Sequence, residues 1–531
     1  MADQLADAVS VIDLATNKIQ TTHIGHRPVW VTLSKDSTKA FVSSQGGADV
    51  AEVDITKSQP LATHKINVDF HPNKSVLTPD GKSLYVANGD ADTISVVDVT
   101  SHRQTATIPV NRNGSKLVGA NPTGLALSQD GKRLYVTNSG HNEVAVINVA
   151  TRKVIGDIPT GWYPTQVLAH GRKLSITSAK GLGAGPNNGP NHPNPTDPHD
   201  TAENQYSGSL IKGLLSTVSE PDAATLAKLT ATVEKNNTAN DPARSSAVPN
   251  QIGTTSSKIK HVIYIVRENR TFDQELGSNG RGNADPSLNL FGDESAPNTR
   301  ALARQFTTFD NFYADAEVSA NGWNWVSQAN SNPWSEEMWP SNYSGRGAPY
   351  PAENNDPESR AKEHDSYFWE HLSKNNISFR NYGFYTTLDK KGKAHGVDKK
   401  ILDPNTDHDF IGWTLDCPDS ARSFAPMAKN CGPKSRVDEW KSDFNKQLAK
   451  GSVPTVQLVR FGNDHTQATK VGVPTPQAYV ADNDQAIGQL VETVSHSPIW
   501  KDTAIFLTED DAQNGPDHVD AHRTIGEVIS P

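Results

Sequence analysis

Apolar and polar positions alternate in short runs over about the first 180 residues. The segments TPDGKSLYVANG (78–89) and SQDGKRLYVTNS (128–139) share one pattern, in which an Asp-Gly pair precedes an alternating run of strand length. Alternation over four to eight residues is typical of a half-buried strand, and Asp-Gly between two such runs is a strong hairpin signal. This part of the chain is therefore predicted to be a series of antiparallel hairpins.

A second unit recurs between these hairpins at nearly constant spacing. Its four copies are AVSVIDLATNKI (8–19), DVAEVDITKSQP (49–60), TISVVDVTSHRQ (93–104) and EVAVINVATRKV (143–154). When the copies are aligned, the equivalent residues are Asp13, Asp54, Asp98 and Asn148. Successive equivalents are 41, 44 and 50 positions apart. A period of this length is typical of a four-stranded propeller blade. We predict four to five blades of an all-β propeller.

These repeats resemble the YVTN-type β-propeller repeat, whose tetrapeptide is intact at 135–138. The resemblance covers about the first 180 residues. We predict propeller blades over 1–205 and a last propeller segment with a connector over 206–257. The first repeat begins partway through its unit, so we expect N-terminal blades, and with them an export signal, to be missing from the chain.

The connector is predicted to hold a short strand and then a helix. In the helix, Leu226, Leu229 and Val233 share one face, and Ser219 or Asp222 precedes it as the candidate N-cap.

From about residue 258 the pattern changes to strand-length apolar runs that end abruptly in polar residues. Three runs do this: HVIYIV ends at Glu268 and Asn269, TVQLV ends at Asp464 and His465, and AIFL ends at Asp510 and Asp511. Open parallel sheets bind ligands at the carboxyl ends of their strands. The alternative for the first run is that Glu268 and Asn269 cap a following helix.

Ser319 lies ahead of another predicted helix, in the segment SANGW (319–323). A serine at a helix N-terminus sits where backbone N–H groups and the helix dipole favour anions, so its hydroxyl could attack a bound phosphate. The alternative is an N-cap serine that has no chemical role.

Oxygen and nitrogen side chains gathered at strand ends suit a hard or borderline divalent cation. Adjacent carboxylates in one crevice also need a cation or a proton to be tolerated. The pattern therefore predicts a metal site, with the identity of the metal open among Zn, Ca, Mg and Mn.

Composition and charge narrow the classes of function. The chain has 531 residues, which is more than a single hydrophobic core usually holds, so at least two domains are expected. It has 60 acidic and 50 basic residues, which give a net charge of −10. No Lys/Arg cluster stands out, which argues against a nucleic-acid partner. No apolar run reaches membrane-spanning length. The two cysteines, Cys417 and Cys431, predict a disulfide in an exported protein, with two inert thiols as the alternative.

The segment HVIYIVRENRTFDQELG (261–277) resembles the opening motif of the phosphoesterase family that includes bacterial nonspecific phospholipases C and acid phosphatases, within the alkaline-phosphatase superfamily. The resemblance runs from Lys258 to the C-terminus. It implies an α/β domain at 258–531 with a central, mostly parallel sheet. We expect this domain to be incomplete, because the chain ends at Pro531 where another core strand is predicted to begin.

The resemblance also implies roles for particular residues. The metal ligands fall on Glu268, Asn269, Asp510 and Asp511, with Asp464 as a further candidate. The nucleophile falls on Ser319, and His465 and His522 are the candidate acid–base groups.

The predicted function is metal-dependent hydrolysis of a phosphate ester through a phosphoserine intermediate, in a periplasmic or secreted protein. The propeller would bind a protein, a glycan or the substrate. The alternative is a propeller-based scaffold with a degenerate phosphoesterase domain. Sulfate-ester hydrolysis is disfavoured because residues 319–323 lack the C/S-x-P-x-R context. Which phosphate ester is the substrate stays open, because selectivity depends on loop shape.

Overall fold

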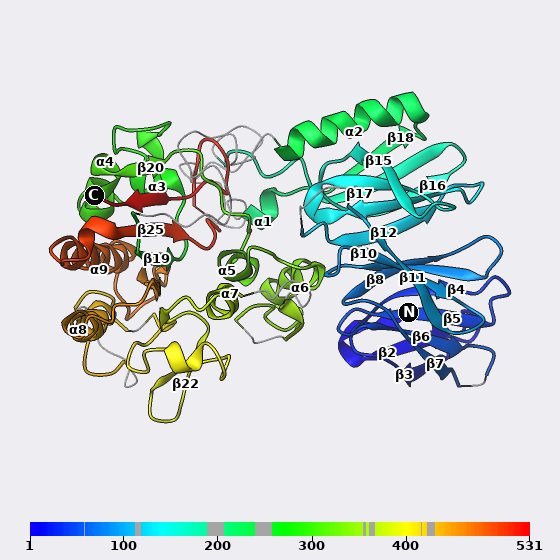
Figure 1. The fold of residues 1–531 in the computed structure, drawn as a ribbon, viewed down its shortest axis with the longest axis horizontal. Coiled ribbons are helices and arrows are strands. Elements are labelled where there is room, and N and C mark those ends of the chain that lie inside the picture. The colour runs from blue at the N-terminus through cyan, green and yellow to red at the C-terminus, as the bar shows by residue number, and fades with distance from the viewer. Residues whose placement is uncertain are drawn as a thin grey trace.

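The computed structural model describes residues 1–57, 59–111, 118–187, 207–238, 258–353, 357–360, 367–415, 417–421, 431–513 and 515–531. Two regions lie side by side (Figure 1). The N-terminal region, on the right in Figure 1, consists of antiparallel sheets, and the C-terminal region, on the left, combines a mixed sheet with helices.

Five antiparallel sheets build the N-terminal region. The strands are β1–β3 (Ala2–Asp3, Ala8–Ile12, Ile19–His23), β4–β7 (Pro28–Leu33, Lys39–Ser44, Asp49–Asp54, Leu61–Asn67), β8–β11 (Pro72–Leu77, Ser83–Asn88, Thr93–Asp98, Arg103–Pro109), β12–β15 (Pro122–Leu127, Arg133–Asn138, Glu143–Asn148, Lys153–Pro159) and β16–β18 (Trp162–His170, Lys173–Gly181, Leu214–Ser219). Three of the sheets are four-stranded meanders in chain order, which is the blade of a propeller. The predicted propeller architecture is confirmed.

The turns and the packing of these blades follow from the repeat. Gly81 and Gly131 adopt φ of +76° and +67°, and the Asp80 carboxylate before the first of them accepts the N–H of Lys82 at 3.1 Å. Neighbouring blades then bury their apolar faces against each other. One such cluster joins β8–β11 to β12–β15 and includes Tyr85 and Val136, both at most 4% exposed.

The connector helix α2 (Ala223–Thr238) packs on β15. Its N-cap is Asp222, whose Oδ1 accepts the N–H of Thr225 at 2.8 Å. Ser219 instead ends strand β18. Leu226 and Val233 are both buried, as their shared helix face predicts. The rest of the predicted connector, 239–257, lies outside the described residues.

The C-terminal region is built on one six-stranded sheet in the order β20-β26-β25-β19-β24-β21. The strands are β19 (His261–Arg267), β20 (Thr307–Phe309), β21 (Phe379–Tyr382), β24 (Val456–Arg460), β25 (Thr503–Glu509) and β26 (Gly526–Ile529). The pairs β25/β19, β19/β24 and β24/β21 are parallel, whereas β26 runs antiparallel to both β25 and β20. The predicted α/β class with a mostly parallel sheet is confirmed. The strand expected at the C-terminus is β26.

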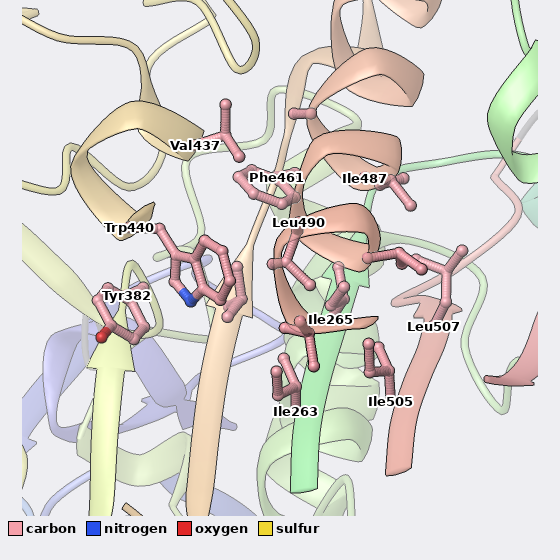
Figure 2. Close-up of a cluster of buried hydrophobic side chains, with 14 of the residues drawn as sticks. Ile263, Ile265, Tyr382, Val437, Trp440, Phe461, Ile487, Leu490, Ile505 and Leu507 are labelled. Atoms are coloured by element: carbon pink, nitrogen blue, oxygen red, sulfur yellow. The ribbon is translucent and has the colours of Figure 1, made fainter. Parts of the chain in front are cut away.

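Helices cover both faces of this sheet. The helices of this part of the chain are α1 (Ser207–Leu210), α3 (Phe272–Leu276), α4 (Pro297–Gln305), α5 (Ser319–Gln328), α6 (Pro333–Tyr343), α7 (Phe368–Lys374), α8 (Arg436–Ala449) and α9 (Pro476–Ser495). A small hairpin is formed by β22 (Thr386–Leu388) and β23 (Ala394–Gly396). Figure 2 shows one face, where Leu490 of α9 and Trp440 of α8 pack over Ile263 and Ile265 of β19. The other face carries an aromatic cluster that includes Trp323 of α5 and Trp369 of α7.

Cys417 and Cys431 form a disulfide, with their Cα atoms 5.1 Å apart. Both are buried and pack with Ile411. The predicted disulfide is therefore confirmed, and the alternative of two inert thiols is wrong. No helix within the part of the chain that the structure describes is long and apolar enough to cross a membrane.

The two regions meet along α5, α6 and the segment that follows α6. His71 of the propeller lies 3.3 Å from the Glu358 carboxylate, and the guanidinium of Arg27 lies 5.1 Å from the centre of the Trp334 ring. In Figure 1, α5 and α6 stand between the six-stranded sheet and the blades. These helices therefore lie at the interface between the propeller and the α/β region.

Candidate active site

Parallel pairing brings three strand ends to one edge of the sheet. Arg267, the last residue of β19, is the register partner of Glu509, the last residue of β25. Val266 is likewise the partner of Arg460, the last residue of β24. The polar residues that follow each strand therefore emerge next to one another, as the sequence pattern predicts.

Four side chains converge at this edge. The Asn269 amide donates to Ser319 Oγ at 3.0 Å, to Asp510 Oδ1 at 3.2 Å and to Asp511 Oδ2 at 2.9 Å. Ser319 Oγ in turn donates to Asp511 Oδ2 at 2.9 Å. All four residues are at most 7% exposed. We call these four residues the serine–carboxylate centre.

Neither helix-cap alternative holds in the structure. Thr271, not Glu268 or Asn269, caps α3, in a capping box with Gln274. Ser319 is the first residue of α5 rather than its N-cap, which is Val318, and its hydroxyl is bonded within the serine–carboxylate centre. Glu268, Asn269 and Ser319 are therefore available for other roles.

Gly322 allows α5 to approach the end of β25. A Cβ atom at this position would lie 2.6 Å from the carbonyl oxygen of Asp510, closer than real Cβ contacts come. The small residue thus sets the distance between the helix that carries Ser319 and the strand end that carries Asp510 and Asp511. The glycine in SANGW is part of how the serine–carboxylate centre is assembled.

The two aspartates of the centre are suited to a cation. Asp510 Oδ2 and Asp511 Oδ1 are buried and have no hydrogen-bond partner among the described residues. Burial, above all, raises the pKa of Asp511 to about 8; the nearby Glu268 charge adds to this, and hydrogen bonds from Ser319 and Asn269 oppose it. Burial and the neighbouring Asp511 also raise the pKa of Asp510 well above its usual value.

A divalent ion would compensate both carboxylates, and Asn269 could present its amide oxygen by rotation of the amide group. The residues present therefore fit the predicted metal.

Glu268 lies beside the centre and is engaged by other side chains. Its Oε1 accepts the indole N–H of Trp323 at 2.6 Å and forms an ion pair with Arg460. The Arg460 guanidinium lies 4.0 Å from the Trp323 ring centre and 4.9 Å from that of Trp413, and it also pairs with Glu353 at 2.5 Å. Glu268 thus contributes negative charge next to the aspartates while its own carboxylate is held by an arginine.

Asp464 lies behind Glu268. Its Oδ1 accepts the Glu268 N–H at 3.3 Å, and its backbone carbonyl accepts from the Arg270 guanidinium. Burial, and then the adjacent Glu509, raise the pKa of Asp464 well above its usual value. Its position matches a residue that supports the strand end, and its role as a metal ligand stays a prediction.

The two candidate acid–base histidines occupy different surroundings. His465 Nδ1 lies 2.8 Å from the carbonyl oxygen of its neighbour Thr466. His522 Nδ1 lies 3.0 Å from Asp520, and its Nε2 lies 3.6 Å from Glu317. Burial lowers the pKa of His522, but these two carboxylates outweigh it and raise the pKa to about 9. His522 therefore carries a proton at neutral pH. Its partner Glu317 lies two residues before Ser319 in the chain.

Two residues that the sequence analysis did not single out, Arg460 and Lys180, also shape the site. Arg460 holds Glu268, and Lys180 of β17 reaches from the propeller to Glu317 at 3.0 Å. The sequence did contain a pattern that could have pointed to Arg460. It is the last residue of its strand, just as Arg267 is the last residue of β19. No local pattern marks Lys180, because its partner lies 137 positions away.

The fold and the site together define an antiparallel propeller joined to an α/β domain that holds a buried serine–carboxylate centre. Residues 279–526 match the profile of the Phosphoesterase family, which makes this part of the chain a phosphoesterase-family domain. The matched stretch contains Ser319, Asp464, Asp510, Asp511 and both candidate histidines, and begins after Glu268 and Asn269. The family resemblance expected from the sequence is thereby confirmed. A search of curated proteins finds no match.

Solved structures resemble part of the chain. Hydrazine synthase of Kuenenia stuttgartiensis matches at 24% identity over 33% of this chain and 50% of its own, with a TM-score of 0.29. The β-propeller domain of Myceliophteria thermophila Cps50 (Swd1) matches at 17% identity over 33% and 56%, also at 0.29. The periplasmic gluconolactonase of Pseudomonas aeruginosa matches at 18% identity over 32% and 56%, at 0.27. The chain thus spans about half the length of these structures.

Proposed function

We propose that the chain hydrolyses phosphate esters at the serine–carboxylate centre, with Ser319 as the nucleophile. The observation that carries the proposal is the convergence of a serine hydroxyl, an amide and two carboxylates with unpartnered oxygens, inside a phosphoesterase-family domain. A hydroxyl hydrogen-bonded to a carboxylate is positioned to lose its proton as it attacks. Hydrolysis of phosphate esters is the reaction that the family match supports.

In the first step, Ser319 Oγ forms a bond to phosphorus and the bond from phosphorus to the leaving oxygen breaks. The hydroxyl proton passes toward Asp511 Oδ2, 2.9 Å away, and the leaving oxygen takes up a proton. The N-terminus of the ten-residue helix α5, where Ser319 is the first residue, favours the negative phosphoryl oxygens. A divalent cation held by Asn269, Asp510 and Asp511 would supply Lewis-acid stabilisation of the phosphoryl charge.

In the second step, water attacks the phosphoserine, the bond from Oγ to phosphorus breaks, and Ser319 regains its proton. His465 and His522 are the candidates for handling the protons of this step. The raised pKa of His522, about 9, favours the role of acid for this residue, and His465 is the other candidate. Separate substitutions of the two histidines, followed by measurement of phosphoserine accumulation, distinguish these roles.

The nucleophile is tested by replacing Ser319 with Ala and comparing it with Ser327→Ala. Ser327 is a matched control because it lies on the same helix and is 1% exposed. Its hydroxyl bonds within the aromatic cluster, to the Trp323 carbonyl and to Tyr385. Ser319→Ala should lose at least about 10³-fold in turnover of an aryl phosphate, since a covalent step is removed. Ser327→Ala should keep most of it. Equal activity of the two variants would refute the assignment.

Metal dependence is tested by chelation and add-back on the full chain. Removal of divalent ions should abolish hydrolysis, and a panel of Zn, Ca, Mg and Mn should restore it to different extents. Asp511→Asn should lower metal affinity as well as turnover. A chelator-treated protein that hydrolyses aryl phosphates at an unchanged rate would show that no cation is needed.

The scaffold alternative predicts a different set of results. A degenerate domain would bind no activating cation and would hydrolyse neither monoesters nor diesters. A substrate panel that contains aryl monoesters, aryl diesters and phospholipids therefore separates the two functions and also shows which ester class the chain prefers. We further propose that the propeller binds a protein or glycan partner. A pull-down with the full chain as bait tests this.

We also infer a periplasmic or secreted location. The support is the Cys417–Cys431 disulfide, which is stable in oxidising compartments. Fractionation of the native host, with the thiols of each fraction labelled before and after reduction, tests this. A fully reduced cytoplasmic protein would contradict it.

A further inference from the structure

One tryptophan beside the strand-end edge of the sheet is exposed, unlike others of the α/β region. Trp413 keeps 40% of its surface exposed, whereas Trp323 and Trp440 are completely buried. It lies in the segment between β23 and α8. A ligand that covers such a ring removes a large apolar surface from water, which favours binding. Trp413 is therefore a candidate contact for a ligand.

Trp413 packs against two residues of the site. Its ring centre lies 4.9 Å from the Arg460 guanidinium and 5.0 Å from the centre of the His465 ring, whose plane is inclined to it by 79°. Arg460 is the last residue of β24, and His465 belongs to the short helix Asn463–His465 that follows this strand. Trp413 thus lies at the edge of the sheet that also carries the serine–carboxylate centre.

A single side chain, that of Arg460, connects Trp413 with the surroundings of the centre. The Arg460 guanidinium contacts two indoles, because it also lies 4.0 Å from the ring centre of Trp323 on α5. Arg460 pairs with Glu268, which directly precedes Asn269 of the serine–carboxylate centre in the chain. The exposed ring is therefore a close neighbour of the centre without belonging to it.

The segment that carries Trp413 is held on both sides of the ring. Arg436, the first residue of α8, is 3% exposed and donates to the carbonyl oxygens of Gly412 and Thr414, each at 2.7 Å. It also donates at 2.8 Å to the carbonyl oxygen of Cys417, which belongs to the disulfide. A side chain on a segment fixed in this way loses little conformational freedom when it binds a ligand.

Gly462 allows the indole to lie close to the chain. A Cβ atom at this position would be 3.3 Å from Cε3 and Cζ3 of Trp413, which is a tight contact. The φ of Gly462 is −113°, so the glycine is not required for its conformational freedom. Its role is the close approach between Trp413 and the turn that holds His465.

The surroundings of the ring favour a flat, uncharged group. The charge of Arg460 is taken up by the carboxylates of Glu268 and Glu353, so it is not available to attract a further anion. An indole binds another aromatic ring by stacking, and this contact removes the apolar surface of both rings from water. A small alkyl group has much less surface to offer for such a contact.

We propose that Trp413 is a specificity-determining residue whose exposed indole stacks on the organic group of the ester and so favours aromatic esters over small alkyl esters. This inference rests on the proposed hydrolysis of phosphate esters at the serine–carboxylate centre, and it names the class of ester. The organic group is the part of such a substrate that extends beyond the phosphate, toward the walls of the site.

The test compares phenethyl phosphate with ethyl phosphate, since both release a primary alcohol. The unaltered chain should have the higher kcat/KM for the phenethyl ester. Trp413→Ala should reduce this preference by about fivefold or more, through KM, whereas Trp413→Phe keeps a ring and should retain most of it. An unchanged preference in Trp413→Ala, or an equal loss for both esters, would overturn the proposal.

The matched control is Trp162→Ala. Trp162 is 57% exposed, but it lies on strand β16 of the propeller. Its replacement should leave the preference for the phenethyl ester unchanged. A loss as large as that in Trp413→Ala would show that the effect does not come from the ring beside Arg460, and would also overturn the proposal.

Binding of the corresponding phosphonates separates this inference from the proposed reaction. Phenethylphosphonate and ethylphosphonate lack the ester bond, so calorimetric titration of the full chain in the presence of Zn²⁺ requires no turnover. Tighter binding of phenethylphosphonate by the unaltered chain, lost in Trp413→Ala, would support the role of Trp413 even if no ester were hydrolysed. Equal binding of the two phosphonates by the unaltered chain would overturn that role even if esters were hydrolysed.

Discussion

Lys180 of the propeller and Glu317 of the α/β region form an ion pair, with Nζ 3.0 Å from Oε1, two residues before Ser319. The same ammonium group lies 3.0 Å from Glu336 of α6. Both carboxylates also accept from the side-chain amide of Asn321 in α5, at 2.7 and 3.2 Å. One lysine from strand β17 thus secures the helix start that presents Ser319.

Lys180→Met should destabilise the chain and reduce hydrolysis. It removes the ammonium group that two buried glutamates share, although Glu317 still has His522 Nε2 at 3.6 Å. Breaking such a buried pair typically costs about 3–5 kcal/mol. Unfolding in urea and turnover of an aryl phosphate measure the two effects. Lys173→Met is the control, because Lys173 lies exposed on the same strand. If the two variants behaved alike, the bridge would have no role in presenting Ser319.

Stability should fall between about pH 6.5 and 9 because of His522. Its pKa is raised from 6.5 to about 9 in the folded chain by the carboxylates of Asp520 and Glu317, which outweigh burial. The folded state therefore binds this proton more tightly than the unfolded state does. The resulting stabilisation is complete below pH 6.5 and is lost as the pH rises through 9. Urea unfolding at several pH values should show this slope, and His522→Gln should lack it.

Glu527 should produce a second pH dependence over a different range. Burial raises its pKa from 4.5 to about 8, Glu275 and Asp484 add to the shift, and Arg267 opposes it. Because the folded chain favours the neutral acid, stability is greatest below pH 4.5 and falls as the pH rises through 8. Glu527→Gln should flatten this part of the profile, whereas Glu492→Gln, at an exposed position, should not. Parallel profiles of the two variants would contradict the assignment.

Gly322→Ala should impair the serine–carboxylate centre without changing any of its side chains. The added Cβ would meet the Asp510 carbonyl at 2.6 Å and push α5 away from the end of β25. We expect loss of both turnover and metal affinity, measured on the same preparation. Gly213→Ala is the control, since its Cβ would meet nothing closer than 3.7 Å. Normal activity of Gly322→Ala would show that the spacing of α5 and β25 is not critical.

Local patterns were enough to predict the architecture and the meeting of strand ends. The repeat with its Asp-Gly turns predicts blades, because each turn and strand is decided by residues close in sequence. The polar residues after β19 and β25 could be placed together because parallel strands bring their carboxyl ends to one edge. Asn269, Ser319, Asp510 and Asp511 follow from that reasoning, and their chemical roles remain predictions.

The partners of these residues could not be predicted in the same way. The family resemblance predicts Glu268 as a metal ligand, yet its carboxylate is held by Arg460, 192 positions away. The position of the Arg460 side chain depends on the Trp323 and Trp413 rings that pack against its guanidinium group. These contacts are set by tertiary packing. The Lys180 contact depends on how the propeller packs against the α/β region, and no periodicity in either region encodes it.

The bridge from Lys180 to Glu317 also bears on how the chain matures. Chains emerge from the ribosome N-terminus first, and regions generally fold in that order. The blade that carries Lys180 is therefore available as a template when the segment with Ser319 is synthesised. Its lysine supplies the charge that lets Glu317 and Glu336 become buried. The propeller thus supplies the cation against which two glutamates of the following region are buried.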